Sequence, residues 1–244
     1  MRLAVILPAA GQSRRFRDPN YKKPFATLGG RAVWLHSAEK FLNRDDCVQT
    51  ILVIASEDRE FFDMKFKANA AIMGVDVVEG GAERADSIER ALARVKADVD
   101  LIAVHDAARP CLVDPWISSV VEAAEKSGAA ILAAPVAATL KRRASDGAIE
   151  ETVSRENLWE AQTPQVFRRD LLLEAYAKRA GFVATDDAQL VERIGQPVSI
   201  VECSRLNIKI TTKEDLRLAE QILKILPKPK LEGFVNPLGD SWMK

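Results

Sequence analysis

The residues best suited to chemistry lie near the amino terminus, where an apolar run ends in a small, basic loop. The apolar run covers residues 3–7, and four small or turn-forming residues follow it: Pro8, Ala9, Ala10 and Gly11. Cations come next, among them Arg14, Arg15, Lys22 and Lys23. Alanine and glycine let backbone N–H groups approach a ligand closely, while arginine and lysine bind phosphate oxygens. The spacing predicts a polyphosphate-binding loop, for which the alternative is a basic, solvated surface loop.

This loop differs from the two commonest phosphate-binding motifs. A dinucleotide fingerprint needs three glycines, but residues 11–16 contain one glycine and two arginines. A P-loop closes with Gly-Lys-Ser or Gly-Lys-Thr, and this loop has neither. A loop that relies on arginine and lysine suits a triphosphate that is itself attacked, because negative charge moves onto the leaving pyrophosphate during the transfer.

A carboxylate follows a later apolar run. Asp106 and Arg109 lie in the string His-Asp-Ala-Ala-Arg-Pro at residues 105–110, directly after a predicted strand, so Asp106 should reach the same carboxyl edge of the sheet. Mg²⁺ prefers one or two carboxylates together with substrate phosphate oxygens, which makes Asp106 the candidate metal ligand. Alternatively Asp106 pairs with Arg109 and fixes the turn, and the two roles are compatible. His105 lies on the strand side, which favours a structural histidine over a catalytic one.

A third loop should reach the same edge. Gly80 and Gly81 stand between a predicted strand and a predicted helix, where they allow close backbone approach. Ser87, near the start of that helix, either bonds a nucleotide base or caps the helix.

Composition limits the class of protein. The chain has 244 residues, enough for one large α/β domain, and its 35 basic and 35 acidic residues leave no net charge to attract nucleic acid or membrane. Cys47, Cys111 and Cys203 are odd in number and lack metal-ligand spacing, which favours reduced thiols. No apolar stretch has membrane-spanning length, and no signal pattern opens the chain. We therefore expect a cytoplasmic protein with no nucleic-acid or membrane partner.

Apolar, β-branched runs alternate with amphipathic patterns along the chain. The runs predict strands at residues 3–7, 50–55, 75–78, 101–105, 129–134 and 198–201. The amphipathic patterns predict helices at residues 32–41, 57–71, 85–95, 114–126, 170–179, 186–194 and 213–225. This alternation predicts an α/β fold with a doubly wound, mostly parallel, Rossmann-like sheet.

Residues 136–160 interrupt the alternation. Segments 136–142 and 149–153 flank the turn sequence Ala-Ser-Asp-Gly at 144–147, which predicts a protruding β-hairpin arm. A two-stranded ribbon is barely stable alone, so we expect the arm to pack on its copy in a homodimer.

Six motifs occur along the chain in a specific order. They are Pro8-Ala9-Ala10-Gly11 with Arg15 and Lys23, Gly80-Gly81 with Arg84-Ala85-Asp86-Ser87, the 105–110 string, Ala134-Pro135-Val136 with Thr139-Leu140-Lys141, Thr163-Pro164-Gln165, and Asn207-Ile208-Lys209-Ile210-Thr211. From residue 3 to residue 226 this order resembles the 2-C-methyl-D-erythritol 4-phosphate cytidylyltransferases. Three positions depart from the family pattern: Ser13 stands where a second glycine is common after Gly11, and Ala82 and Ala138 stand where acidic residues are common.

The resemblance implies a role for each matching residue. Arg15 and Lys23 resemble the pair that binds the triphosphate and stabilises charge on the α-phosphate. The residues that resemble the nucleotide pocket are Ala9, Ala10, Gly11, Gly81, Ser87 and Asp106. Those that resemble the grip on the sugar phosphate are Thr139, Arg155, Lys209, Asp106 and Arg109, with Thr139 and Arg155 reaching in from the arm of the partner subunit. The implied catalytic residues are therefore Arg15, Lys23, Arg155 and Lys209, and Mg²⁺ is expected mainly on the CTP phosphates, with Asp106 as its protein ligand.

The implied reaction transfers CMP from CTP to 2-C-methyl-D-erythritol 4-phosphate, in isoprenoid precursor biosynthesis. We expect a nucleotidyltransferase domain over residues 1–226, with a dimerisation arm at about 136–160 and a C-terminal extension at 227–244. One alternative is a cytidylyltransferase for another polyol phosphate, such as ribitol 5-phosphate. Another is a non-catalytic nucleotide-binding regulator that has kept the fold.

Overall fold

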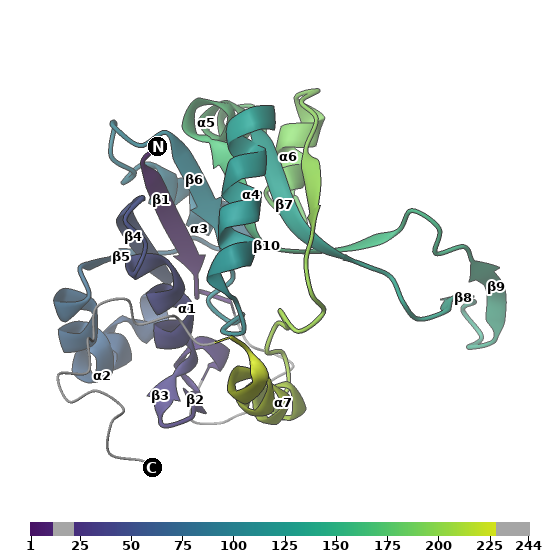
Figure 1. Cartoon of the computed structure of the whole chain (residues 1–244), viewed down its shortest axis with the longest axis horizontal. Coiled ribbons are helices and arrows are strands. Elements are labelled where there is room, and N and C mark those ends of the chain that lie inside the picture. The colour runs from purple at the N-terminus through teal and green to yellow at the C-terminus, as the bar shows by residue number, and fades with distance from the viewer. Residues whose placement is uncertain (12–21, 228–244) are drawn as a thin grey trace, which may run out of the picture.

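A seven-stranded sheet forms the centre of the computed structural model, which describes residues 1–11 and 22–227 (Figure 1). The strands lie in the order β11 (Ser199–Glu202), β7 (Ala129–Pro135), β10 (Trp159–Arg168), β6 (Leu101–Val104), β1 (Leu3–Pro8), β4 (Cys47–Ile54) and β5 (Val75–Glu79). β10 runs antiparallel to β6 and β7, while each of the other neighbouring pairs is parallel. The prediction of a mostly parallel sheet is therefore confirmed.

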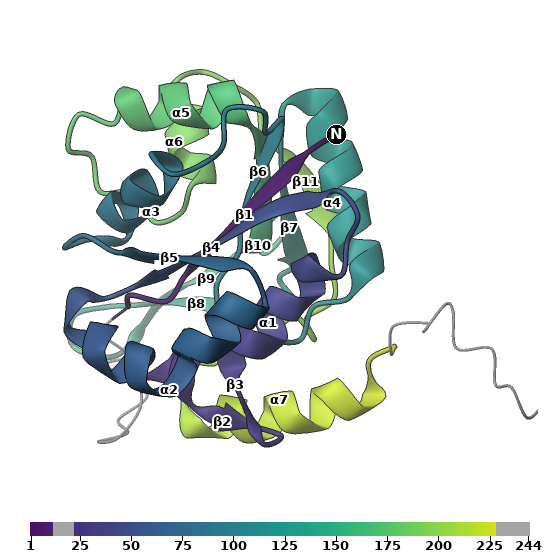
Figure 2. The ribbon, with the colours of Figure 1, turned by 90° about the vertical axis from the view of Figure 1, so that its left-hand side faces the viewer.

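Helices cover both faces of this sheet (Figure 2). The cause is visible in β1, which is apolar at every position of the run, so alternate side chains enter two different cores. Leu3, Val5 and Leu7 pack with α1 (Val33–Leu42), α2 (Arg59–Ile72) and α4 (Asp114–Ser127). Ala4 and Ile6 pack with α3 (Arg84–Leu92), α5 (Arg169–Ala177) and α6 (Ala188–Arg193) on the other face. This arrangement confirms the doubly wound architecture.

The central strand β10 is the strand of the main sheet that the sequence patterns missed. Pro164 lies inside it and follows a cis peptide bond. Proline cannot donate a ladder hydrogen bond, so a proline within an apolar run argues against a central strand. The strand accommodates Pro164 where its pairing with β7 shifts register, between Ala161 and Gln165.

The arm is a separate two-stranded sheet of β8 (Leu140–Arg143) and β9 (Ile149–Val153), and it extends away from the body (Figure 1). Gly147 has a φ of +95° in the connecting turn, where a glycine is favoured. At the end of the expected arm, about residues 136–160, Trp159 and Glu160 already pair with β7 in the main sheet. The packing of the arm on a second subunit stays a prediction.

The remaining elements are short, apart from the last helix, which lies beside a small hairpin at the bottom of Figure 1. A short helical turn, η1 (Lys23–Phe25), leads into the hairpin of β2 (Thr27–Leu28) and β3 (Arg31–Ala32), and η2 (Ser56–Asp58) precedes α2. The last helix, α7 (Lys213–Ile225), packs its buried face beside β2 in a small core of its own. Of the expected extension at 227–244, the structure describes Pro227 alone. Within residues 1–11 and 22–227, no helix is both long enough and apolar enough to cross a membrane.

Candidate active site

A cavity of about 410 Å³ lies at the carboxyl edge of the sheet, beyond the ends of β1, β5 and β6. The three expected loops meet here, together with the segment that follows β11. Its lining is formed by Pro8, Ala9, Ala10, Gly11, Lys23, Pro24, Gly81, Ala82, Glu83, Arg84, Ser87, Asp106, Ala108 and Lys209. Parallel strands place successive loops side by side, which explains how residues from four distant segments share one cavity.

Backbone hydrogen bonds continue the sheet into these loops. The N–H of Ala9 donates to the carbonyl of Val53, and the N–H of Gly80 donates to the carbonyl of Ile54, each at 2.7 Å. Space is tight here, because a Cβ at Gly80 would lie 2.6 Å from the Ser87 Oγ atom. The same Cβ would lie 3.0 Å from the Ala10 Cβ atom, so a side chain at Gly80 would crowd the first loop as well.

Ser87 fastens the third loop to the first turns of α3. Its Oγ accepts a hydrogen bond from the Gly81 N–H at 3.1 Å and donates one to the Glu83 carbonyl at 3.1 Å. Glu83 is the N-cap of the helix, and its own N–H donates to Asp86. The capping role considered for Ser87 is therefore wrong, and the hydroxyl holds the backbone of Gly81 at the cavity instead.

Asp106 carries a buried negative charge that three cations neutralise. Lys209 Nζ lies 2.8 Å from its Oδ2 atom, and Arg109 Nε lies 3.3 Å from the same oxygen. Burial disfavours the charged form, but attraction to Lys209, Arg109 and Arg84 outweighs it and holds the pKa of the Asp106 carboxyl well below its usual range. The pairing with Arg109 that was considered for the turn is present, and Asp106 faces the cavity at the same time.

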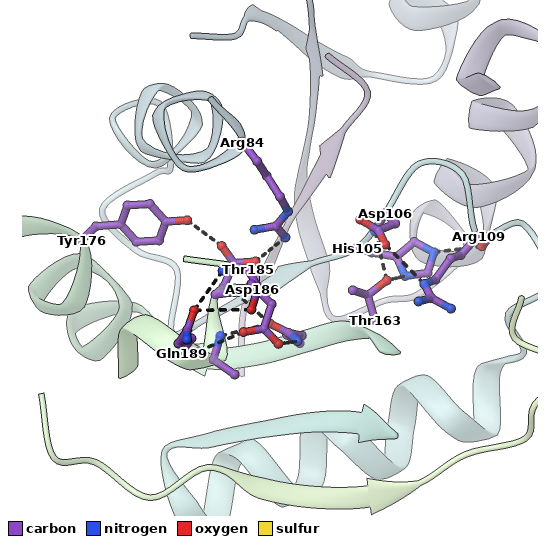
Figure 3. Close-up of polar contacts among 12 residues, drawn as sticks. Arg84, His105, Asp106, Arg109, Thr163, Tyr176, Thr185, Asp186 and Gln189 are labelled. Atoms are coloured by element: carbon purple, nitrogen blue, oxygen red, sulfur yellow. Dashed lines mark hydrogen bonds and ion pairs between the residues drawn. The ribbon is translucent and has the colours of Figure 1, made fainter. Parts of the chain in front are cut away.

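The loop that carries Asp106 is fixed by a chain of buried hydrogen bonds, drawn in Figure 3. The backbone N–H of Asp106 donates to Thr163 Oγ1 at 3.0 Å, and that hydroxyl donates to His105 Nδ1 at 3.1 Å. The Nε2–H of His105 donates to the Arg109 carbonyl at 3.0 Å. Burial lowers the pKa of His105 to about 4, so the ring is neutral. With both nitrogens engaged, His105 has the structural role that its sequence position favoured.

The segment that presents Lys209 is anchored on both sides. Arg109 Nη1 donates to the Asn207 carbonyl at 2.7 Å, and the buried Asn207 amide donates to the Thr163 carbonyl at 2.9 Å. On the other side, the Ile210 N–H donates to the Ala108 carbonyl at 2.8 Å. Lys209 therefore projects from a fixed backbone, and its side chain is 40% exposed.

Among the described residues, three expected site residues do not line the cavity of a single chain. Arg109 uses its guanidinium to tie Asp106 to Asn207 and is absent from the lining. Thr139 and Arg155 are exposed on the arm, where Arg155 donates to the Ala137 carbonyl. Arg15 lies within residues 12–21, outside the described residues.

Arg84 is the lining residue of most consequence that was not assigned a role from the sequence. It is the first residue of α3, and its side chain is 30% exposed. The signal was present, because Arg84 directly follows the Gly80-Gly81 loop, but a cation at a helix start reads equally well as a solvated surface residue. Its partner, Asp187, comes from a segment far along the chain that no local pattern connects to the loop.

The cavity has few groups suited to a metal ion. Across residues 1–11 and 22–227, no three His, Cys, Asp or Glu side chains gather as metal ligands. Within residues 1–11 and 22–227, Lys209 and Arg109 both contact Oδ2 of Asp106, and no side chain pairs with Oδ1. One buried carboxylate fits an ion that enters with substrate phosphates and takes most of its ligands from them.

Comparisons with known proteins agree along most of the chain. A family model described as 2-C-methyl-D-erythritol 4-phosphate cytidylyltransferase matches residues 3–225. The enzyme of that name from Rhodopirellula baltica is 44% identical over 232 residues, which cover 91% of this chain and 94% of the relative. Its counterpart from Bacillus pumilus is 41% identical over 222 residues, covering 90% and 96%. The crystal structure of the Thermus thermophilus enzyme superposes with a TM-score of 0.76 at 34% identity, covering 92% of this chain and all of the other.

Proposed function

Because this chain belongs to the 2-C-methyl-D-erythritol 4-phosphate cytidylyltransferase family, we propose that the cavity beyond β1, β5 and β6 is where it transfers CMP. The protein is a nucleotidyltransferase that uses CTP and 2-C-methyl-D-erythritol 4-phosphate, in the synthesis of isoprenoid precursors. The products are 4-diphosphocytidyl-2-C-methyl-D-erythritol and pyrophosphate. The observation that carries the assignment of the site is the convergence of Lys23, Asp106 and Lys209 on one cavity.

The nucleotide end of the cavity is assigned to the small residues. Ala9, Ala10, Gly11 and Gly81 have short side chains or none, so a base can reach backbone N–H and C=O groups. Ser87 supports this reading by fixing the Gly81 backbone through its hydroxyl. Recognition of cytosine then depends on backbone groups that are already in place before the ligand arrives.

The chemical step is an in-line displacement at the α-phosphorus of CTP. A phosphate oxygen of the acceptor forms the new P–O bond, and the bond from the α-phosphorus to the bridging oxygen of pyrophosphate breaks with its electron pair going to pyrophosphate. The phosphate dianion is already nucleophilic, so no general base is needed. Lys23, and Arg15 within residues 12–21, stabilise the charge that develops on the phosphates, while Lys209 positions the acceptor.

Mg²⁺ is proposed as the cofactor, with Asp106 as its protein ligand and the CTP phosphates as its main ligands. When bound, the ion neutralises part of the triphosphate charge. Within the protein, Lys209 and Arg109 keep Asp106 ionised, so the carboxylate is able to accept a cation at Oδ1 across the working pH range.

The arm is proposed to complete the site of a second subunit. Thr139 and Arg155 are exposed. Within its own chain, Arg155 donates a hydrogen bond to the Ala137 carbonyl, at a position on the arm. An arginine on an exposed hairpin could bind the acceptor phosphate in the cavity of the other subunit of a homodimer. The exposed apolar side chains Ile149, Leu158 and Trp159 support burial of the arm against another surface.

A cytoplasmic location is proposed from the cysteines. Cys47, Cys111 and Cys203 are all free thiols, and burial raises the pKa of Cys111 to about 12 and that of Cys203 to about 11. Such thiols stay protonated and unreactive at neutral pH, as expected for a protein kept in a reducing compartment.

Pyrophosphate release tests the function directly. The assay supplies CTP and Mg²⁺ with either 2-C-methyl-D-erythritol 4-phosphate or ribitol 5-phosphate as acceptor, and we expect rapid release with the former alone. Faster release with ribitol 5-phosphate would identify a different polyol phosphate as the substrate. No release with any acceptor, in a protein that still binds CTP, would indicate a nucleotide-binding regulator.

A further inference from the structure

Arg84, a residue of the cavity lining, belongs to a polar cluster that also contains Tyr176 and Asp186 (Figure 3). Arg84 lines the cavity, and its Nη2 atom lies 2.5 Å from Oδ2 of Asp187. Asp187 is fully buried and immediately precedes α6. The pair therefore connects the cavity wall to a side chain that has no access to solvent or to substrate.

Asp187 is held from several directions. The hydroxyl of Tyr176 donates to its Oδ1 atom at 2.5 Å, so each carboxylate oxygen has a partner. Its backbone N–H donates to Gln165 Oε1 at 3.1 Å, and the amide of Gln165 donates in turn to Asp186 at 2.8 Å. A buried carboxylate is tolerated when it is paired and hydrogen-bonded, which these contacts achieve. The result is one fixed position for the negative charge that Arg84 meets.

The cluster also fixes its own protonation states. Burial and the nearby Asp187 carboxylate raise the pKa of Tyr176, so its hydroxyl keeps its proton and remains a donor. Burial disfavours the charge on Arg84, but attraction to Asp187 outweighs it and raises the pKa of the guanidinium. Arg84 is thus a permanent cation. Its Nη2 atom contacts Asp187, and the other N–H groups of the guanidinium can donate to a ligand in the cavity.

Arg84 lies beside the groups proposed to hold the nucleotide. It follows the Gly81 loop and lies one helical turn before Ser87. Its charge also acts on Asp106, whose pKa it helps to lower. A shift of this guanidinium would therefore act mainly on the nucleotide end of the cavity, because Lys209 keeps its own direct contact with Asp106.

We propose that Asp187, oriented by Tyr176 and Gln165, is a positioning residue that fixes Arg84 for binding of the nucleoside triphosphate. The inference rests on the proposed function, since it names a further residue of the same site. A purely structural cluster would instead stabilise the packing of α5 and α6 on the sheet without acting selectively on CTP. A positioning role predicts a change in the KM and Kd for CTP, whereas a purely structural role predicts a change in thermal stability alone.

The test compares Asp187→Asn and Tyr176→Phe with the wild type in steady-state kinetics and in CTP titration calorimetry. Loss of a charge-assisted hydrogen bond should raise the KM and Kd for CTP about tenfold or more in Asp187→Asn. Tyr176→Phe should give a smaller rise, because the ion pair is kept. The KM for the acceptor phosphate should be unchanged in both.

Arg179→Gln is the matched control for packing. Arg179 lies just after α5 and contacts α3 through Asp86 at 2.7 Å and Glu89 at 3.1 Å, but it does not line the cavity. It should lower thermal stability without the selective change in CTP binding. An Arg84→Gln background adds a second check, because Asp187→Asn should have no further effect on the KM for CTP once Arg84 is gone.

Three results would overturn the proposal: an unchanged Kd for CTP in folded Asp187→Asn and Tyr176→Phe, an undiminished effect of Asp187→Asn in the Arg84→Gln background, or an equal change in Arg179→Gln. If Asp187→Asn does not fold, Tyr176→Phe alone decides through its Kd for CTP. Failure of the proposed function would appear separately, as a wild-type enzyme that does not release pyrophosphate.

Discussion

Lys209 Nζ lies 2.8 Å from Oδ2 of Asp106, and this contact joins the segment after β11 to the loop after β6 inside the cavity. Asp106 is buried and Lys209 is partly exposed. The fixed carboxylate of Asp106 therefore holds the Lys209 ammonium group at the cavity. Under the proposed function, this contact would orient Lys209 before the acceptor phosphate binds. It also keeps Asp106 ionised at any pH where the enzyme would work.

Asp106→Asn removes the negative charge that holds Lys209 while keeping the shape of the side chain. We expect turnover to fall about 100-fold, because Lys209 loses its orientation and the proposed metal ligand loses its charge. Initial rates of pyrophosphate release measure the effect. Asp98→Asn is the control, since Asp98 is an exposed carboxylate paired with Arg2 at the surface. Turnover near the wild-type level in Asp106→Asn would argue against its place in the site.

Lys22 and Lys23 are adjacent in sequence but differ in surroundings, which allows a sharp comparison. Lys23 lines the cavity, whereas Lys22 Nζ is bound to Asp58 at 2.8 Å and to Glu57 at 2.9 Å. We expect Lys23→Ala to lower turnover about 100-fold or more with little change in melting temperature. Lys22→Ala should instead lower the melting temperature, because it leaves Asp58 without its cation, and should keep turnover. Normal turnover in Lys23→Ala together with lost turnover in Lys22→Ala would contradict this assignment.

The buried His105 predicts a specific dependence of stability on pH. Its pKa is about 4 in the folded protein and near 6.5 in an unfolded chain, so the unfolded state binds the proton first as the pH falls. Stability should therefore decrease between about pH 6.5 and pH 4, by up to about 3 kcal/mol, and this contribution should be level above pH 7. Asp106 contributes a further loss at lower pH, because its pKa in the folded state is also depressed.

Proton NMR of the imidazole ring measures the His105 titration directly. The resonances should keep the shifts of a neutral ring down to about pH 5, with the proton on Nε2. A titration midpoint at or above 6.5 would show that burial does not keep the His105 ring neutral.

The comparison of sequence with structure shows where local patterns stop being informative. The apolar run of β1 and the amphipathic pattern of α7 were visible in the sequence, because burial of one strand or helix face sets the residue type at each position. Strand β10 was not, since Pro164 removes a donor and its central place depends on pairing with two distant strands. The loops of the site were predictable because parallel strands share one carboxyl edge.

The Arg84–Asp187 pair illustrates what a single sequence hides. Asp187 and Tyr176 are polar residues in or beside helices, and a local pattern would place such residues at the surface. Their burial depends on mutual hydrogen bonds between segments that meet only in the folded chain. Pairings of this kind follow from tertiary packing, which hydrophobic periodicity does not encode.

Mixing inactive subunits tests whether the arm acts across a dimer. If Arg155 serves the cavity of the partner subunit, Lys23→Ala and Arg155→Ala subunits should regain activity when mixed, because one site of each mixed dimer has both native residues. Recovery of up to about half of the activity per mixed dimer is expected, as measured by pyrophosphate release after verified subunit exchange. An absence of recovery would place Arg155 in the site of its own chain or outside any site.

A crystal structure with CTP and Mg²⁺ tests the central claim most directly, because without the acceptor the nucleotide is not consumed. The account predicts cytosine against the backbone of Ala9, Gly11 and Gly81, with the triphosphate within hydrogen-bonding distance of Lys23 and facing Asp106. A nucleotide bound elsewhere on the protein, or in the cavity with its phosphates directed away from Lys23, would contradict it.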